Sequence, residues 1–202
     1  MPSAADIVTF LDPPVPPGES PYVDGQGPST DVRVVEPDPA WPSIAQALID
    51  RIRAALGDRV LSLEHVGSTS VPGLAAKPVI DLDLAVADPD DEDAYVPPLV
   101  VAGFVHVVRE PWWYGHRLLR GTDPAANLHV YGPDSAESVR QRLFRDWLRQ
   151  HPEDRDRYAL AKIEAASAAR AAQEHVQQYN ARKERVVRDI YARLFQAAGL
   201  RG

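Results

Sequence analysis

The stretch VLSLEHVGSTSVPGLAAKPVIDLDLAV, residues 60–86, decides the fold because it predicts two strands joined by a glycine-containing turn. Residues 60–66 alternate between apolar and polar side chains, and residues 78–86 form a second, more apolar strand. In the turn, glycine lets the backbone approach an anion, and hydroxyl and N–H groups can bind phosphate oxygens. The turn residues predicted to bind phosphate are Gly67, Ser68, Thr69 and Ser70. A Gly-Ser turn by itself is more often an ordinary turn.

Two carboxylates in the second predicted strand strengthen this interpretation. Asp81 and Asp83 are two residues apart, so their side chains project from one face of a strand, roughly 6–7 Å apart. Carboxylates so placed can share divalent cations. Their apolar neighbours make unpaired burial costly, which favours a strand edge facing a site. Lys77, just before this strand, either neutralises the pair or holds a phosphate, or is an ordinary surface lysine.

The rest of the chain predicts a mixed α/β (α+β) domain. A helix capped by Asp38, with Pro39 at its first position, is expected to end at Gly57, and a shorter helical segment is expected at 97–102. Further strands are expected at 104–108, 116–120 and 128–131. Helices follow from Ser135, interrupted at 151–154 and continuing as one long last helix through 165–174. The expected architecture is a mixed β-sheet with flanking helices and a C-terminal helical cap.

Length and composition narrow the function classes. The chain has 202 residues, about one domain, and contains no cysteine. A disulfide framework, a zinc ribbon and a thiol nucleophile are therefore excluded, and oxygen or imidazole must hold any metal. No apolar run reaches the ~20 residues of a membrane helix, and residues 1–30 lack the pattern of a signal peptide. We expect a cytoplasmic protein with no membrane partner.

The charge is unevenly distributed along the chain. The net charge of -7 argues against a long nucleic-acid partner, because such binding rests on Lys and Arg neutralising phosphates. Residues 1–134 carry 8 basic and 20 acidic side chains, whereas residues 135–202 carry 14 basic and 9 acidic ones. This split reflects either the packing of helix surfaces or an anion-binding role for the C-terminal segment.

Several motifs together resemble the GrpB (UPF0157-type) family, which is grouped with the nucleotidyltransferase fold. They are EHVGSTSVPGLAAKPVIDLDL, the upstream DPAW, the strand NLHVY, the block FRDWLRQHPEDRDRYALAK and the spacing from Tyr179 to Lys183. The resemblance covers about residues 32–196. Residues 1–30 include the stretch PPVPPG and have little periodic apolar pattern, so they are expected to form a proline-rich, extended or disordered lead. A single domain over 31–202 would follow, with a sheet core at 31–134 and a helical cap at 135–202.

The resemblance implies a chemistry. In nucleotidyltransferases a Gly-Ser pair after the first strand holds the triphosphate, which matches Gly67 and Ser68. Two carboxylates of the next strand bind Mg²⁺, which matches Asp81 and Asp83 and implies Mg²⁺ or Mn²⁺ as the cofactor. Such a site transfers a nucleoside monophosphate from a nucleoside triphosphate to an acceptor and releases pyrophosphate.

The sequence departs from that pattern in the strand NLHVY, where His129 replaces a third carboxylate. A histidine there ligates a divalent ion, acts as general base on an acceptor hydroxyl or contacts a phosphate; alternatively, catalysis is lost.

Basic and aromatic residues outside the central motif supply further candidates. The resemblance favours Lys162, Tyr179 and Lys183 as nucleotide-binding residues of the cap, where the alternative is a solvated helix face. His65, His116 and Arg117 are candidate substrate-binding residues, and Glu64 is expected to orient Lys77 or an arginine.

Three functions remain open at this stage. The first is a metal-dependent nucleotidyltransferase-like enzyme that acts on a nucleotide and a small-molecule acceptor. The second is a non-catalytic nucleotide or anion sensor. The third is a biosynthetic enzyme that performs ligation or acid-base chemistry in the same cleft. The sequence leaves the oligomeric state open.

Overall fold

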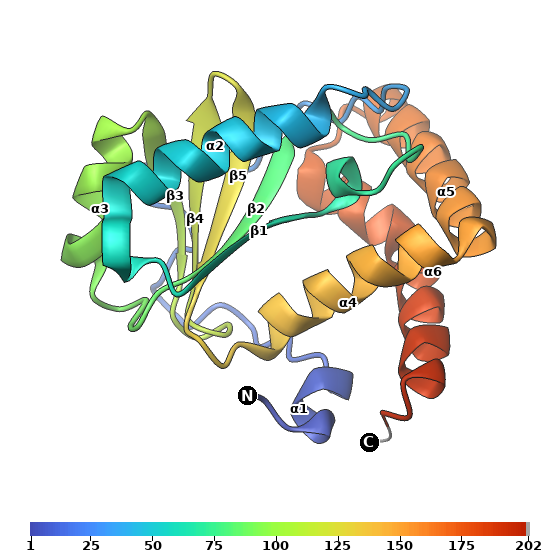
Figure 1. The fold of residues 1–202 in the computed structure, drawn as a ribbon. Helices are drawn as coiled ribbons and strands as arrows, with labels where there is room; N and C mark the ends of the chain where they lie inside the picture. The colour runs from blue at the N-terminus through green and yellow to red at the C-terminus, as the bar shows by residue number, and fades with distance from the viewer. Residues whose placement is uncertain (201–202) are drawn as a thin grey trace.

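The computed structural model describes residues 1–200 as a five-stranded sheet with helices around it (Figure 1). The helices are α1 (Ala4–Val8), α2 (Trp41–Leu56), α3 (Glu92–Val101), α4 (Ala136–Gln150), α5 (Pro152–Ala171) and α6 (Val176–Ala197). The strands are β1 (Ser62–Val66), β2 (Ile80–Ala85), β3 (Phe104–Glu110), β4 (His116–Thr122) and β5 (Ala125–Tyr131). Two 3₁₀ turns, η1 (Gly57–Arg59) and η2 (Ser68–Ser70), flank β1. The predicted mixed α/β class is confirmed.

The sheet has the strand order β1-β2-β5-β4-β3. Strands β2 and β5 run parallel, and the other neighbouring strands are antiparallel. The register places Asp81 opposite Asn127 and Asp83 opposite His129 on β5, with Glu64 of β1 on the other side of Asp83. Side chains alternate between the two faces of a sheet, so these polar residues of β1, β2 and β5 share one face.

The opposite face is the apolar core. Helices α2 and α3 pack on it, and the cluster includes Leu48, Ile52, Leu82, Leu99 and Leu128, each fully buried. Helix α2 has this apolar stripe because its buried residues recur at helical spacing, and it ends at Gly57, whose φ is 56°. The predicted end at Gly57 is confirmed, but the helix begins at Trp41, with Ala40 as its cap, rather than at Pro39 with Asp38 as its cap.

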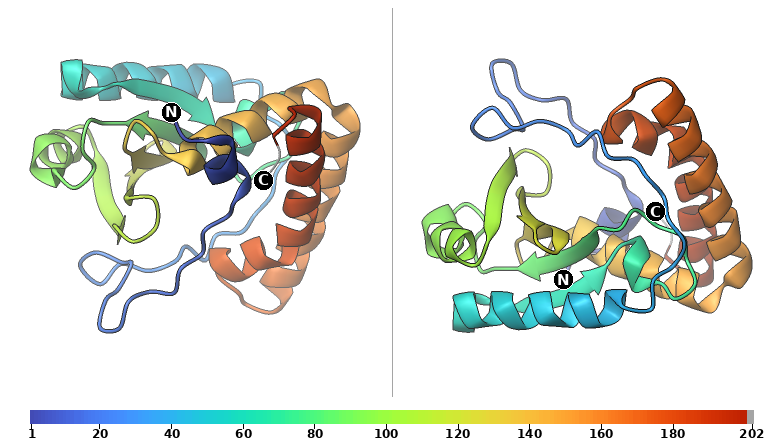
Figure 2. Two further views of the ribbon diagram at one scale, coloured as in Figure 1. Left: turned by 90° about the horizontal axis from the view of Figure 1, so that it is seen from below. Right: turned by 90° about the horizontal axis from the view of Figure 1, so that it is seen from above.

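Helices α4–α6 cover the polar face. Ser135 caps α4 as predicted, because its side chain accepts a hydrogen bond from the backbone N–H of Ser138. Helix α4 then reaches the polar face, where the Ser138 hydroxyl donates to Asp83 at 2.7 Å. Helices α5 and α6 pack against each other on the side of the molecule away from α3 (Figure 2).

The prediction of one long last helix is wrong. The structure ends α5 at Ala171 and begins α6 at Val176, with Gln173 in the left-handed region at φ 56°. The break is fixed from outside the segment, because the backbone N–H of Val176 donates to the carbonyl of Ser29 at 2.8 Å. The interruption predicted near 151–154 is present as the junction between α4 and α5.

The prediction of an extended or disordered N-terminal lead is wrong at α1, where the lead forms a short helix. Arg140 of α4 has an exposed fraction of 0%, and its Nη1 donates to the carbonyls of Asp6, Ile7 and Thr9 at 2.9, 3.0 and 3.1 Å. Further along, Tyr22 forms a single antiparallel bridge with Val108 on β3. The lead therefore packs against both the cap and the sheet. Among the helices within residues 1–200, none is sufficiently long and apolar to cross a bilayer.

Candidate functional site

A cavity of about 620 Å³ lies between the polar face of the sheet and helices α4–α6. It brings together most of the site residues predicted from the sequence. Those that line it are Gly67, Ser68, Lys77, Asp81, His129, Lys162, Tyr179 and Lys183. The predicted residues that do not line it are His65, Thr69, Ser70, Asp83, His116 and Arg117.

The turn after β1 brings its backbone against the second strand. Gly67 has φ 67°, and a Cβ at this position would lie 2.8 Å from the Cβ of Asp81 and closer still to its carboxylate. Only glycine fits this close approach. The hydroxyl of Ser70 donates to the Gly67 carbonyl at 2.6 Å, and Thr69 pairs with His65 Nε2 at 2.9 Å. Thr69, Ser70 and His65 therefore shape the turn, while Gly67 and Ser68 line the cavity.

The two carboxylates of β2 have different environments. Asp81 lines the cavity, and its Oδ1 accepts a hydrogen bond from Asn127 Nδ2 at 2.9 Å. Although burial opposes it, the pKa of Asp81 is lowered, because Asn127 and Lys77, and His129 when its ring is protonated, stabilise the charged carboxylate. Asp83 has an exposed fraction of 2%, and burial raises its pKa. Its Oδ2 accepts from Ser138 and lies 3.7 Å from Arg142 Nη1.

His129 lies beside Asp81 at the cavity wall. Its Nε2 is 3.9 Å from Asp81 Oδ1, beyond hydrogen-bonding distance, and its Nδ1 is 3.0 Å from His116 Nε2. Within residues 1–200, no three His, Asp or Glu side chains are grouped so that they could hold a metal ion. Because Asp83 is buried and does not line the cavity, the arrangement of Asp81, Asp83 and His129 does not fit a two-metal centre there.

Positive charge converges on the cavity from the three lysines of the chain, Lys77, Lys162 and Lys183. Lys162 Nζ donates to the Ala75 carbonyl at 2.6 Å, and burial lowers the pKa of Lys162 well below its usual value. Burial also lowers the pKa of Lys77. The Lys183 amine lies over the Tyr179 ring, 5.3 Å from its centroid, and Lys77 Nζ is 5.9 Å from the same ring. An anionic ligand would meet amines on several sides.

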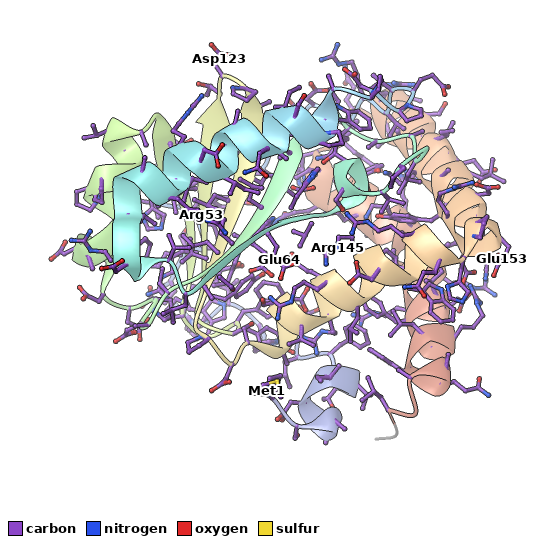
Figure 3. All side chains as sticks on the ribbon, viewed as in Figure 1. Met1, Arg53, Glu64, Asp123, Arg145 and Glu153 are labelled. Atoms are coloured by element: carbon purple, nitrogen blue, oxygen red, sulfur yellow. The ribbon has the colours of Figure 1, made fainter. Side chains whose placement is uncertain are left out.

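Two arginines of α4 bind the cap to the turn. Arg145 Nη1 donates to Glu64 Oε2 at 2.7 Å and to the His65 carbonyl at 3.0 Å, and Figure 3 shows the Glu64 and Arg145 side chains facing each other. Arg149 donates to the Ser70 carbonyl at 2.8 Å. The sequence predicted Lys77 or an arginine as the partner of Glu64, and in the structure the partner is Arg145.

Two predicted substrate-binding residues lie elsewhere. Arg117 points to the other side of the sheet, where it pairs with Asp90 at 2.7 Å and Glu92 at 2.9 Å. His116 lies behind His129 and contacts the cavity only through that ring. The neighbouring Trp113 holds the lead, because its indole N–H donates to the Leu11 carbonyl at 2.9 Å.

The sequence interpretation missed other cavity residues, including Asn127, Arg120, Asp31 and Tyr158. Asn127 could have been predicted from the sequence. It is two residues from His129 in NLHVY, so the two side chains lie on the same face of the strand. Arg120 is opposite Asn127 in the β4–β5 register, which the sequence does not show. Ser29 also lines the cavity and comes from the lead, which was not expected to contribute.

Comparisons with known proteins agree on one family. The family model described as GrpB protein matches residues 31–193. The UPF0157 protein BH1888 of Halalkalibacterium halodurans is 44% identical over 162 residues, which are 80% of this chain and 82% of that protein. A dephospho-CoA kinase of Mycolicibacterium paratuberculosis is 32% identical over 197 residues, 85% of this chain but 48% of that protein. The chain thus spans about half the length of this kinase.

A solved structure shares the fold as well. The crystal structure of conserved protein GrpB from Enterococcus faecalis matches with a TM-score of 0.70 and 27% sequence identity. The match covers 82% of this chain and 99% of the crystallised one. Together with the family match over residues 31–193, this shows that the chain belongs to the GrpB family.

Proposed function

We propose that the cavity binds a nucleoside triphosphate as its Mg²⁺ or Mn²⁺ complex and transfers the nucleoside monophosphate group to a small-molecule acceptor. The observation that carries the proposal is the convergence of all three lysines on a cavity whose wall is formed by the Gly67 turn and Asp81. Amines around a polyphosphate are the electrostatic arrangement that stabilises charge in phosphoryl and nucleotidyl transfer.

The residues have separate tasks in this proposal. The Gly67–Ser68 turn offers backbone N–H groups to the phosphates, and the three lysines balance their charge. The buried Tyr158 and Tyr179 rings lie under the lysine amines and hold them toward the cavity. Asp81 and His129 both line the cavity, where Asp81 would hold the cation that accompanies the nucleotide and His129 would contact the acceptor.

A second candidate is nucleotide or anion binding without transfer. The observation that favours it is the position of Asp83, which is buried on Ser138 and Arg142 instead of lining the cavity. The resemblance to dephospho-CoA kinase extends over less than half of that protein. The phosphate-binding pattern G-x-x-x-x-G-K-[ST] does not occur in this sequence, so neither candidate relies on a kinase P-loop.

Binding can be measured by isothermal titration calorimetry with ATP, GTP, CTP and UTP, each with and without Mg²⁺ or Mn²⁺. We expect at least one nucleotide to bind, and Lys183→Met to weaken it roughly tenfold or more through loss of a charged contact. The matched control is Arg185→Met, an exposed cation on the same helix. No binding to any nucleotide, or equal loss in both variants, would contradict the proposal.

The two aspartates give a second comparison. Asp81→Asn should reduce the gain in nucleotide affinity that the divalent ion provides, whereas Asp83→Asn should leave it unchanged, because Asp83 does not line the cavity. Transfer and binding alone are then separated by measuring pyrophosphate release with pooled small-molecule acceptors. Release that Asp81→Asn abolishes supports the enzyme, and tight binding with no release supports the sensor.

A further inference from the structure

Three side chains from three neighbouring strands form a hydrogen-bonded row that ends in the cavity. Glu110 lies at the end of β3, His116 begins β4, and His129 lies on β5. Glu110 Oε2 is 2.9 Å from His116 Nδ1, and His116 Nε2 is 3.0 Å from His129 Nδ1. The remaining ring nitrogen, His129 Nε2, is the one next to Asp81.

The middle ring of this row is held rigidly. His116 has an exposed fraction of 5%, stacks on Tyr131 with ring centroids 5.0 Å apart, and meets the edge of Trp113 at 5.2 Å. Burial lowers the pKa of His116 to about 4, so the ring is neutral and carries one proton at neutral pH.

The proton positions follow from what each group can donate. A neutral imidazole has one N–H donor and one acceptor, and a carboxylate only accepts. Because Glu110 accepts from His116 Nδ1, the other nitrogen of His116 must accept, and His129 must donate to it from Nδ1. We propose that Glu110 and His116 are positioning residues that fix His129 with its proton on Nδ1 and a lone pair on Nε2 facing the cavity.

This tautomer predicts the chemical class of the acceptor. His129 Nε2 and Asp81 Oδ1 are then two acceptors 3.9 Å apart with no proton between them, and a ligand hydroxyl can donate there. This inference rests on the proposed transfer reaction. The acceptor in that reaction is an alcohol. Its O–H proton passes to Nε2, its oxygen bonds to the α-phosphorus, and the bond to pyrophosphate breaks. Asp81 stabilises the imidazolium that results.

The tautomer can be measured without any activity. Long-range ¹H–¹⁵N spectra of the ¹⁵N-histidine-labelled protein at neutral pH distinguish a protonated from an unprotonated ring nitrogen. A His129→Gln variant assigns the ring by the signals it removes. We expect a protonated Nδ1 and an unprotonated Nε2 for His129. A proton on Nε2 with none on Nδ1 would overturn the proposal, and this measurement needs only the wild-type chain to fold.

Replacing Glu110 by a cationic residue should reverse the donor and acceptor roles along the row. In Glu110→Lys the ammonium only donates, so His116 Nδ1 must accept, its proton moves to Nε2, and His129 shifts to the Nε2–H tautomer. Glu110→Asp keeps the acceptor and should retain the wild-type tautomer. Glu184→Lys, at an exposed position on α6, is the control for a charge reversal. An unchanged His129 tautomer in folded Glu110→Lys would contradict the positioning role.

Kinetics separate this inference from the proposed function. If pyrophosphate is released, Glu110→Lys should lower kcat roughly 10²–10⁴-fold, as loss of a general base does, with KM for the nucleotide unchanged. If the tautomer is as expected but the wild-type protein releases no pyrophosphate, the positioning role stands and the transfer reaction is wrong.

Discussion

Gly67 shows how one residue without a side chain connects the turn to the acid pair. Its positive φ and its contact with Asp81 both exclude a Cβ. The turn backbone therefore lies directly against the carboxylate that lines the cavity, so a ligand bound there would meet both the turn and Asp81.

Replacing this glycine should be costly. Gly67→Ala introduces a Cβ into the Asp81 contact and strains a positive φ, so we expect a loss of about 1–3 kcal/mol in the free energy of unfolding. Nucleotide affinity should fall as well. Gly27→Ala is the control, because nothing lies within 4 Å of its Cβ, and it should change stability by less than about 0.5 kcal/mol. Urea unfolding of both variants measures the difference, and equal stabilities would contradict the close-approach argument.

At the scale of elements, α4 connects the parts of the molecule. Ser138 binds Asp83 of β2, Arg145 binds Glu64 of β1, and Arg140 binds the carbonyls that end α1. One helix thus fixes the polar face, the turn and the N-terminal lead relative to one another.

Arg140 should be the main anchor of the lead. Arg140→Met leaves Glu137 and three carbonyls without their buried donor, so we expect a loss of about 3–5 kcal/mol in stability. Hydrogen exchange should accelerate at residues 4–10. Arg185→Met, which removes an exposed guanidinium from α6, is the control. Unchanged exchange at residues 4–10 would show that other contacts hold α1.

The elements that could be predicted are those with local signals. The strands of residues 60–86 alternate or lie in apolar runs, and Ser135 precedes a helical pattern. The break before Val176 could not be predicted, because AASAARAAQE favours a helix and the partner, Ser29, is far away in the chain. Strand spacing correctly placed Asp81 and Asp83 on one face. It could not show that Ser138, 55 residues away, covers Asp83.

At the scale of the whole molecule, folding places neutral histidines between the layers. Burial lowers the pKa of His65 to about 4 from an ordinary 6.5, and that of His116 to the same value. Between these two pH values the unfolded chain binds protons that the folded chain does not.

Stability should therefore fall as the pH is lowered from about 6.5 to about 4, by about 1.4 kcal/mol per pH unit for each such proton. In His65→Gln, whose amide can still pair with Thr69, the slope should be shallower. Urea unfolding across this pH range measures both slopes, and equal slopes would show that His65 does not remain neutral in the fold.

The concentration of lysine in the cavity has a practical consequence. The chain carries 22 Lys+Arg, and all its lysines are in the cavity wall, so the outer cationic surface consists of guanidinium groups. Amine-directed acylating reagents should modify the native protein at Met1, Lys77 and Lys183, because Lys162 is buried. A ligand that fills the cavity should then shield Lys77 and Lys183 while Met1 reacts as before, which intact-mass and peptide mass spectrometry can follow. The extent of acylation at Lys77 and Lys183 therefore reports whether the cavity is occupied, whatever the ligand is.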